Sequence, residues 1–266
     1  MLPFPPRIRA AAAAAALIVI ALTSRPSRAQ VNIEALRSDI QGRKAYVAAQ
    51  VSYTGRAGNV NGSVVSAAAF AALELGRHLA FVKLSGDYAQ FNGDPTLAKA
   101  FAHVRYNYRI FPFLFAEAFA QVEADKFQRL ALRQLDGVGA RFAIVRHDVV
   151  QVYYGTAWMF DYSRLNDQEG LLSTFHGPSW IAQRWSNYAA ISVRVGSRGR
   201  FADTVYVQPR FNDFSDVRLL NDASFALDID KRFSAKISSL VRHNSTPPSR
   251  VKSTDVETMT SLVVTF

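Results

Sequence analysis

The last twelve residues, 255 to 266, constrain the fold of this chain more than any other stretch. Apolar and polar side chains alternate along them, and the chain stops at the aromatic residue Phe266. The more apolar parity consists of Val256, Thr258, Thr260, Leu262, Val264 and Phe266. The opposite, mostly polar parity consists of Asp255, Glu257, Met259, Ser261, Val263 and Thr265. A period of two residues predicts a β-strand with one apolar face.

A final alternating strand that ends in an aromatic residue resembles the assembly signal of outer-membrane β-barrels in Gram-negative bacteria. We therefore expect an all-β fold, a transmembrane antiparallel β-barrel. Its last strand, ending at Phe266, would be recognised by the barrel-assembly machinery. The alternative is the last strand of a soluble sandwich, in which a few polar residues would normally follow.

The N-terminal region has the features of an export signal. Arg7 and Arg9 precede a continuous apolar run over residues 10–22, which is too short to span a bilayer as a helix. Small residues at Ser27 and Ala29 then suit a cleavage site before Gln30. We expect a signal peptide over 1–29, a short periplasmic segment over 30–42 and the barrel over 43–266. A transmembrane anchor at the N-terminus is the alternative.

Composition supports an exported membrane barrel and argues against nucleic-acid binding. The chain has no cysteine, so disulfides contribute nothing to its stability. The formal net charge is +10, and the expected leader holds four arginines and no acid, so the exported part carries 10 − 4 = +6. The basic residues are scattered singly rather than clustered, which does not favour a nucleic-acid surface.

Runs of period two separated by turn residues predict about twelve strands in an up-and-down meander. We expect them at 43–54, 59–74, 77–91, 97–109, 111–124, 127–144, 148–163, 180–196, 200–212, 217–229, 232–243 and 255–266. Connections after even-numbered strands are tight, whereas the two longest, near 164–179 and 244–254, follow odd-numbered strands. Short periplasmic turns and longer external loops are the barrel pattern, and an even strand number places both termini in the periplasm.

Alternation within single strands predicts which face is which. In the strand near 148–163, Tyr154, Trp158 and Phe160 share the apolar parity, and Gln151 and Asp161 share the other. An apolar exterior and a polar interior are required of a membrane barrel. The stretch from 134 to 137, Gln-Leu-Asp-Gly, interrupts this pattern, and we expect a bulge or a break in alternation there.

Two motifs resemble one known family. They are the run from 31 to 37, VNIEALR, and the stretch from 136 to 142, DGVGARF, which follows the run LALR from 130 to 133. Both are similar to motifs of the salt-induced outer-membrane proteins. The resemblance implies an outer-membrane barrel of about this size and no established activity or catalytic residues.

The inward parity carries more bases than acids, so the interior is the candidate functional site. The candidate lumen-lining charges are Lys83, Arg105, Arg109, Glu117, Arg133, Arg141, Arg184, Arg194 and Arg210. Charges this dense must be paired or wet. Two interpretations follow: a salt-bridged interior that stiffens a structural or stress-related membrane protein, or a narrow, weakly anion-selective pore.

An enzymatic alternative is an outer-membrane lipid hydrolase that uses His243 and Ser245 at the end of a strand. Thr246-Pro247-Pro248 follows, unlike the pattern of outer-membrane phospholipases, so we do not expect an enzyme. A soluble periplasmic β-protein is a further alternative. The histidines have no metal-ligand spacing, and no phosphate-binding loop precedes a helix, so no cofactor is expected. The expected partners are membrane lipid and the assembly machinery, and the sequence gives no indication of oligomeric state.

Overall fold

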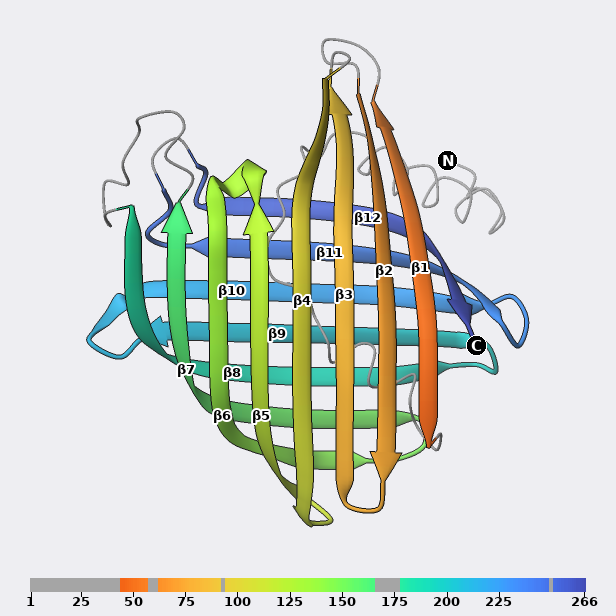
Figure 1. Ribbon diagram of the computed structural model, residues 1–266. Coiled ribbons are helices and arrows are strands. Elements are labelled where there is room, and N and C mark those ends of the chain that lie inside the picture. Colours follow the sequence, from red (N-terminus) through yellow and green to blue (C-terminus); the bar gives the residue numbers. More distant parts are fainter. Residues whose placement is uncertain (1–43, 57–61, 92–93, 166–177, 249–250) are drawn as a thin grey trace, which may run out of the picture.

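The computed structural model describes residues 44–56, 62–91, 94–165, 178–248 and 251–266. Twelve β-strands make up almost all of this, with one short 3₁₀ helix, η1 (Lys126–Gln128) (Figure 1). The strands are β1 (Ala45–Arg56), β2 (Gly62–Leu75), β3 (His78–Phe91), β4 (Asp94–Phe111), β5 (Leu114–Asp125), β6 (Leu130–Arg146), β7 (Val150–Leu165), β8 (Ser179–Val195), β9 (Gly199–Arg210), β10 (Asp213–Asp228), β11 (Phe233–Asn244) and β12 (Thr254–Thr265).

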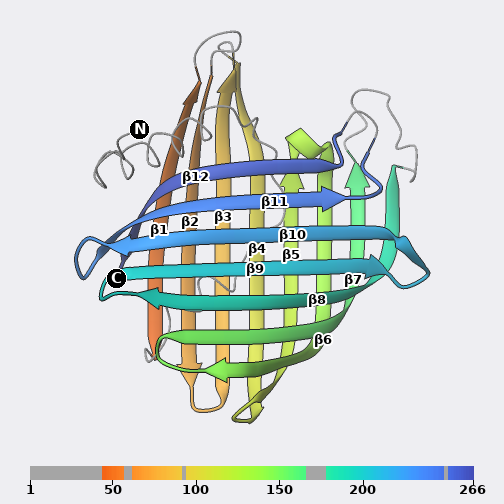
Figure 2. The same ribbon diagram turned by 180° about the vertical axis from the view of Figure 1, so that it is seen from behind.

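Each strand pairs antiparallel with the next, and β12 returns to pair with β1, which closes the sheet into a barrel. The predicted twelve-strand meander is therefore confirmed. Closure removes the free edges at which a sheet would otherwise pair with another chain. The strands of β1 to β5 cross those of β8 to β12 steeply on the opposite wall, as Figures 1 and 2 show from the two sides. The described part of the chain contains no helix long and apolar enough to cross a membrane.

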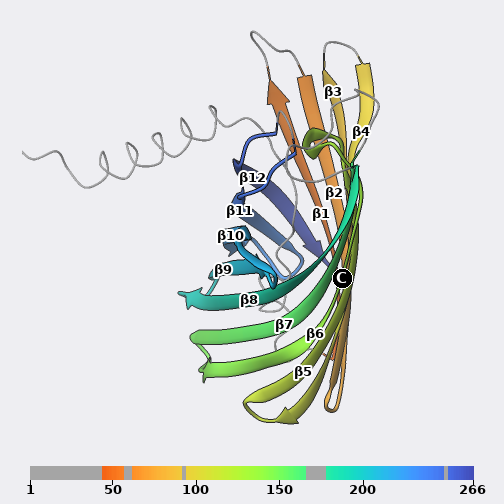
Figure 3. The ribbon, with the colours of Figure 1, turned by 90° about the vertical axis from the view of Figure 1, so that its left-hand side faces the viewer.

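The closing seam between β1 and β12 is short. Only four pairs of residues lie in register there, from Ala48 opposite Thr265 to Val51 opposite Leu262. Beyond these pairs, toward the end of the barrel where β1 connects to β2, strand β1 leans away from β12, as Figure 3 shows. Inside the barrel, the Gln50 amide crosses the seam and donates to Ser261 Oγ at 2.8 Å.

The two ends of the barrel differ in their connections. At one end, turns of two to four residues join β2 to β3, β4 to β5, β6 to β7, β8 to β9 and β10 to β11. We call this the turn end and the opposite one the loop end. The first residues of β1 and the last of β12 meet at the turn end. In the β10–β11 turn, the backbone N–H groups of Arg232 and Phe233 donate to Asp230, which holds the pKa of that carboxyl below its usual value.

Side chains alternate between an apolar exterior and a polar interior, as the sequence predicts. On β7, Tyr154 and Trp158 are exposed on the outer face, while Asp161 on the opposite parity is fully buried. Exterior aromatic side chains also pair across strands: the Trp185 indole donates to Thr156 Oγ1 at 2.8 Å. Exposed large apolar residues occur on every strand, and the buried charges lie inside. This reverses the arrangement of a soluble protein.

A bulge or a break in alternation is expected at residues 134–137; the bulge is wrong, whereas the break in alternation is confirmed. Pairing of β6 with β7 runs without a shift from Leu132 to Ala143, and the register shifts lie on either side of this stretch. Leu135 turns inward and is 4% exposed, whereas Gln134 faces out and its amide donates to the Asp136 carboxylate at 2.7 Å. Because the two outward polar groups satisfy each other, the ladder stays regular although the polarity is reversed.

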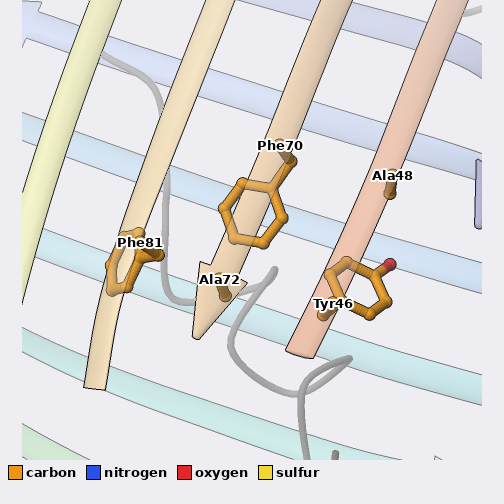
Figure 4. Packing of buried hydrophobic residues seen from close by; sticks show 5 residues of the cluster. All are labelled: Tyr46, Ala48, Phe70, Ala72 and Phe81. Atoms are coloured by element: carbon orange, nitrogen blue, oxygen red, sulfur yellow. The ribbon is translucent and has the colours of Figure 1, made fainter. Parts of the chain in front are cut away.

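Two apolar clusters lie inside the barrel. One joins β1, β2 and β3 and consists of Tyr46, Ala48, Phe70, Ala72 and Phe81 (Figure 4). The other consists of Tyr188, Ala190, Tyr206 and Leu220. Both narrow the interior with large side chains, so the lumen is not a uniform water-filled tube.

Candidate functional site

The most densely bonded part of the interior is centred on Asp161 of β7. Its Oδ2 accepts from Arg184 Nε at 3.0 Å and from Arg218 Nη1 at 2.6 Å. Its Oδ1 accepts from Ser163 at 2.9 Å and lies 3.9 Å from Arg133 Nε. The carboxylate is therefore surrounded by three guanidinium groups, and it is fully buried.

The same network extends to both sides. Arg133 donates to Glu123 of β5 at 3.2 Å, and Arg184 donates to Asp216 of β10 at 2.9 Å. Arg184, which is 0% exposed, also donates to the backbone carbonyls of Gln208 and Asp216. Charged side chains thus join β5, β6, β7, β8 and β10 in a continuous network across this half of the barrel. We call it the Asp161 network.

A second buried ion pair joins Arg105 of β4 and Glu117 of β5, with 3.2 Å between Arg105 Nη1 and Glu117 Oε1. Glu117 also accepts from Asn107 at 2.8 Å and from the Tyr188 hydroxyl at 3.2 Å. The Arg105 guanidinium lies 5.2 Å from the centre of the Phe119 ring. A buried charge held by this many partners is stiffened in one position.

Glycines on the inner face allow these aromatic rings to lie against the wall. A methyl group at Gly137 would collide with the Phe119 ring, and one at Gly155 would collide with the Tyr188 ring. Gly137 belongs to the DGVGARF motif, so part of that motif provides room for an interior ring.

The part of the wall formed by β1 to β4 and β10 to β12 encloses a cavity of about 130 Å³. Four basic side chains line it: Lys83, Lys99, Lys236 and Arg242. Three acids also line it: Asp87, Asp222 and Glu257. Apolar contacts come from Phe70, Leu240, Met259 and Val263, among others. We call this space the lysine cavity.

The lysines of the cavity differ from the arginines of the Asp161 network. Within the described part of the chain, no carboxylate lies at ion-pair distance from the ammonium groups of Lys83, Lys99 or Lys236. Asp87 and Asp222 act on Lys83 only at longer range. Arg242, by contrast, lies 3.7 Å from Glu257.

The predicted lumen-lining residues fall into three groups. Arg105, Glu117, Arg133, Arg141 and Arg184 are buried inside the barrel. Lys83 lines the lysine cavity, and Arg210 lies 3.8 Å from Asp216 near the loop end. Arg109 and Arg194 lie toward the turn end, where Arg109 donates to the Gly76 carbonyl and Arg194 is exposed.

Several interior charges were not among the predicted residues. They are Lys99, Asp125, Asp216, Arg218 and Asp222. Arg218 and Asp222 share a parity with the apolar residue Leu220, which is also buried. Because this parity mixes polar and apolar residues, the sequence did not show that it faces the interior. Asp216 precedes the predicted start of its strand at 217, whereas β10 begins at Asp213. Lys99 lies on the same polar parity as His103 and Arg105, so the sequence did indicate that it faces inward.

The residues of the enzymatic alternative do not form a catalytic pair. The Ser245 hydroxyl donates to the Ser215 carbonyl at 2.8 Å and accepts from the Val217 backbone N–H at 2.8 Å. The His243 ring instead bonds Thr254 Oγ1 at 2.8 Å. A nucleophile must lie within hydrogen-bond reach of its base, and this serine is bonded to backbone. Over the described residues, no cluster of histidine and carboxylate side chains could hold a metal ion.

A closed antiparallel barrel of twelve strands, apolar outside and charged inside, has the architecture of an outer-membrane β-barrel. The chain belongs to the family described as "Protein of unknown function, DUF481", whose model matches residues 49–266. No curated protein matches its sequence.

Several solved barrels resemble this chain at low sequence identity. The NanC porin is 9% identical over 83% of this chain and 98% of its own, with a TM-score of 0.49. The translocator domain of the autotransporter NalP from Neisseria meningitidis is 12% identical over 97% of this chain and 98% of its own, with a TM-score of 0.47. The KdgM porin, in a complex with disordered oligogalacturonate, is 8% identical over 84% and 98%, with a TM-score of 0.44.

Proposed function

We propose that this protein is a narrow, weakly anion-selective pore of a Gram-negative outer membrane. The observation that carries the proposal is the lysine cavity, where three ammonium groups face open space without a carboxylate at ion-pair distance in the described chain. Basic side chains that line a pore favour anions. A barrel of twelve strands lies between small filled barrels and wide porins, which suits a narrow conduit.

The route for ions runs through the lysine cavity, beside the Asp161 network. That network fills the side of β5 to β8 with paired charges, and the open space lies beside β1 to β3 and β10 to β12. A second hollow at the turn end is lined by Tyr46, Arg198, Arg200 and Asp228, among others. We infer that the two spaces lie on one path, narrowed between them by the cluster that contains Tyr46 and Phe70.

Planar-bilayer recording of the refolded protein under a KCl gradient tests this proposal. We expect small unitary conductances. The reversal potential should be shifted from zero toward the equilibrium potential of chloride. Replacement of Lys83 by Gln should reduce the anion preference, and Arg77→Gln, in the exposed β2–β3 turn, should leave it unchanged. Absence of channels, or a preference for cations at neutral pH, would refute the pore and favour a purely structural barrel.

Export and assembly complete the proposal. The expected signal peptide at 1–29, with cleavage near Ala29, and the segment 30–42 lie outside the described residues, as does the VNIEALR motif. We infer that the turn end faces the periplasm and that the assembly machinery binds the last strand through Phe266. This side chain is 78% exposed, beside the seam. The resemblance to salt-induced proteins supports a stress-related role as the second candidate function.

The geometry at Ser245 supports no hydrolase. Replacement of Ser245 by Ala should leave a lipase assay at the background of the unmodified protein, because the hydroxyl is engaged with the backbone of β10. A serine-dependent lipase activity would instead revive the enzymatic alternative.

A further inference from the structure

The lysine cavity has the features of a built ligand site as well as those of a conduit. We propose that it binds a small organic monocarboxylate, with the carboxylate between Lys83 and Lys236 and a short hydrocarbon portion against the apolar lining. The site rests on the proposed pore for its biological role, but its occupancy can be measured separately.

The first argument is mutual repulsion among the bases. Lys83, Lys99, Lys236 and Arg242 all line this one small cavity, so their like charges repel one another. Of these, Lys83 and Lys236 lie on different strands, β3 and β11. Buried charges without close partners are costly. An anion placed between Lys83 and Lys236 relieves this repulsion and supplies the missing partner.

The second argument concerns neutral donors. The hydroxyls of Ser66, Ser85 and Ser238 line the same cavity, and within the described chain they have no hydrogen-bond partner. Ser85 lies two residues from Lys83, and Ser238 two residues from Lys236, so each hydroxyl shares the inner face with a lysine. Ammonium and hydroxyl donors together match the several lone pairs of a carboxylate.

The third argument concerns charge and size. Four bases and three acids line the cavity, which leaves 4 − 3 = +1 and favours a monoanion over a polyanion. A volume of about 130 Å³ exceeds the space for one water several-fold and suits a solute of a few heavy atoms. Phe70, Leu240 and Val263 add an apolar surface that an inorganic ion would not use.

Calorimetric titration of the folded, detergent-solubilised protein with sodium butyrate tests the site at low ionic strength. We expect saturable binding, absent for butyramide, which has the same shape without the charge. Lys83→Gln and Lys236→Gln should each weaken binding at least about tenfold, because each removes a charge-assisted hydrogen bond. Arg77→Gln should bind butyrate like the unmodified protein. A boiling-dependent gel shift verifies that each variant is folded.

Three results would overturn the site. The first is that the folded protein does not bind butyrate. The second is that the two lysine variants bind butyrate as tightly as the unmodified protein does. The third is that the protein binds inorganic phosphate as tightly as butyrate, which would mean that charge alone is recognised. Failure of the pore is distinguishable, since a barrel that binds butyrate through Lys83 but shows no conductance would keep the site and remove the conduit.

Discussion

At the scale of single residues, the interior combines two kinds of charge. Asp161 compensates Arg184 and Arg218, and all three side chains are almost fully removed from solvent. A buried ion pair adds little net stability, but removal of one partner leaves an uncompensated charge. The second kind is a partly exposed ion pair. Arg200 and Asp228 form one, with side chains 31% and 36% exposed, so water screens their interaction.

This difference predicts unequal effects of two equivalent substitutions. Asp161→Asn should lower the free energy of unfolding by about 3 kcal/mol. Asp228→Asn should lower it by less than about 1 kcal/mol. Urea unfolding in lipid vesicles, followed by the gel shift on boiling, measures both. Equal effects would mean that the Asp161 network is as well solvated as the end of the barrel.

Two glycines provide a second comparison. Gly155→Ala should destabilise the barrel by about 1–3 kcal/mol, because the new methyl group displaces the Tyr188 ring that bonds Glu117. Gly86→Ala is the matched control, since its methyl group would meet only the Lys99 carbonyl oxygen at an ordinary 3.7 Å. The same unfolding assay applies, and a Gly155 variant as stable as the Gly86 variant would show that Tyr188 can move freely.

At the scale of elements, the strands are unequally held. β6 and β7 pair over most of their length, whereas β1 and β12 share four residue pairs and a backbone bond from Phe266 N–H to the Val47 carbonyl. The seam is therefore the part of the ladder with the fewest hydrogen bonds to lose. The lysine cavity lies directly behind it, lined by Ala48, Gln50 and Met259 from the two seam strands.

Hydrogen exchange should follow this inequality. The amides that join β1 to β12 should exchange faster than those that join β6 to β7, because local opening at the seam breaks fewer bonds. Exchange measured by mass spectrometry in lipid nanodiscs gives both rates. Uniform protection around the barrel would show that the seam is as stable as the longer ladders.

At the scale of the whole molecule, the two ends of the barrel differ. Short turns gather at one end with the first and last strand termini, and the long connections gather at the other. The chain contains no cysteine, so a single introduced cysteine reports its own position without interference.

Labelling of intact cells tests the orientation. Lys252→Cys, in the exposed β11–β12 connection, should react with a membrane-impermeant maleimide. Lys231→Cys, in the exposed β10–β11 turn, should react only after the outer membrane is permeabilised. The opposite labelling pattern would show that the barrel has the reverse orientation. If the protein were found in the soluble extract with both sites labelled, it would not be a membrane protein.

Much of this architecture was predictable from the sequence. Alternation along single strands, as in Tyr154, Trp158 and Asp161, identifies the faces, because successive side chains on a strand point to opposite sides. The count of twelve strands and the inward direction of Arg105, Arg133, Arg141 and Arg184 follow from the same period. The expected bulge at Gln134–Gly137 failed because polarity is only an indirect sign of backbone regularity, and Gln134 and Asp136 satisfy each other.

Only the tertiary structure decided which interior charges are paired. Arg184 and Lys83 have the same inward parity, yet Arg184 meets Asp161 and Asp216 at ion-pair distance and Lys83 faces open space. The carboxylates in question lie on other strands, and the tilt and register of each strand set which charges share a height in the lumen. A one-dimensional pattern determines the face on which a side chain lies, because that depends on local geometry alone. It does not determine the partner across the barrel, because that depends on how all twelve strands close.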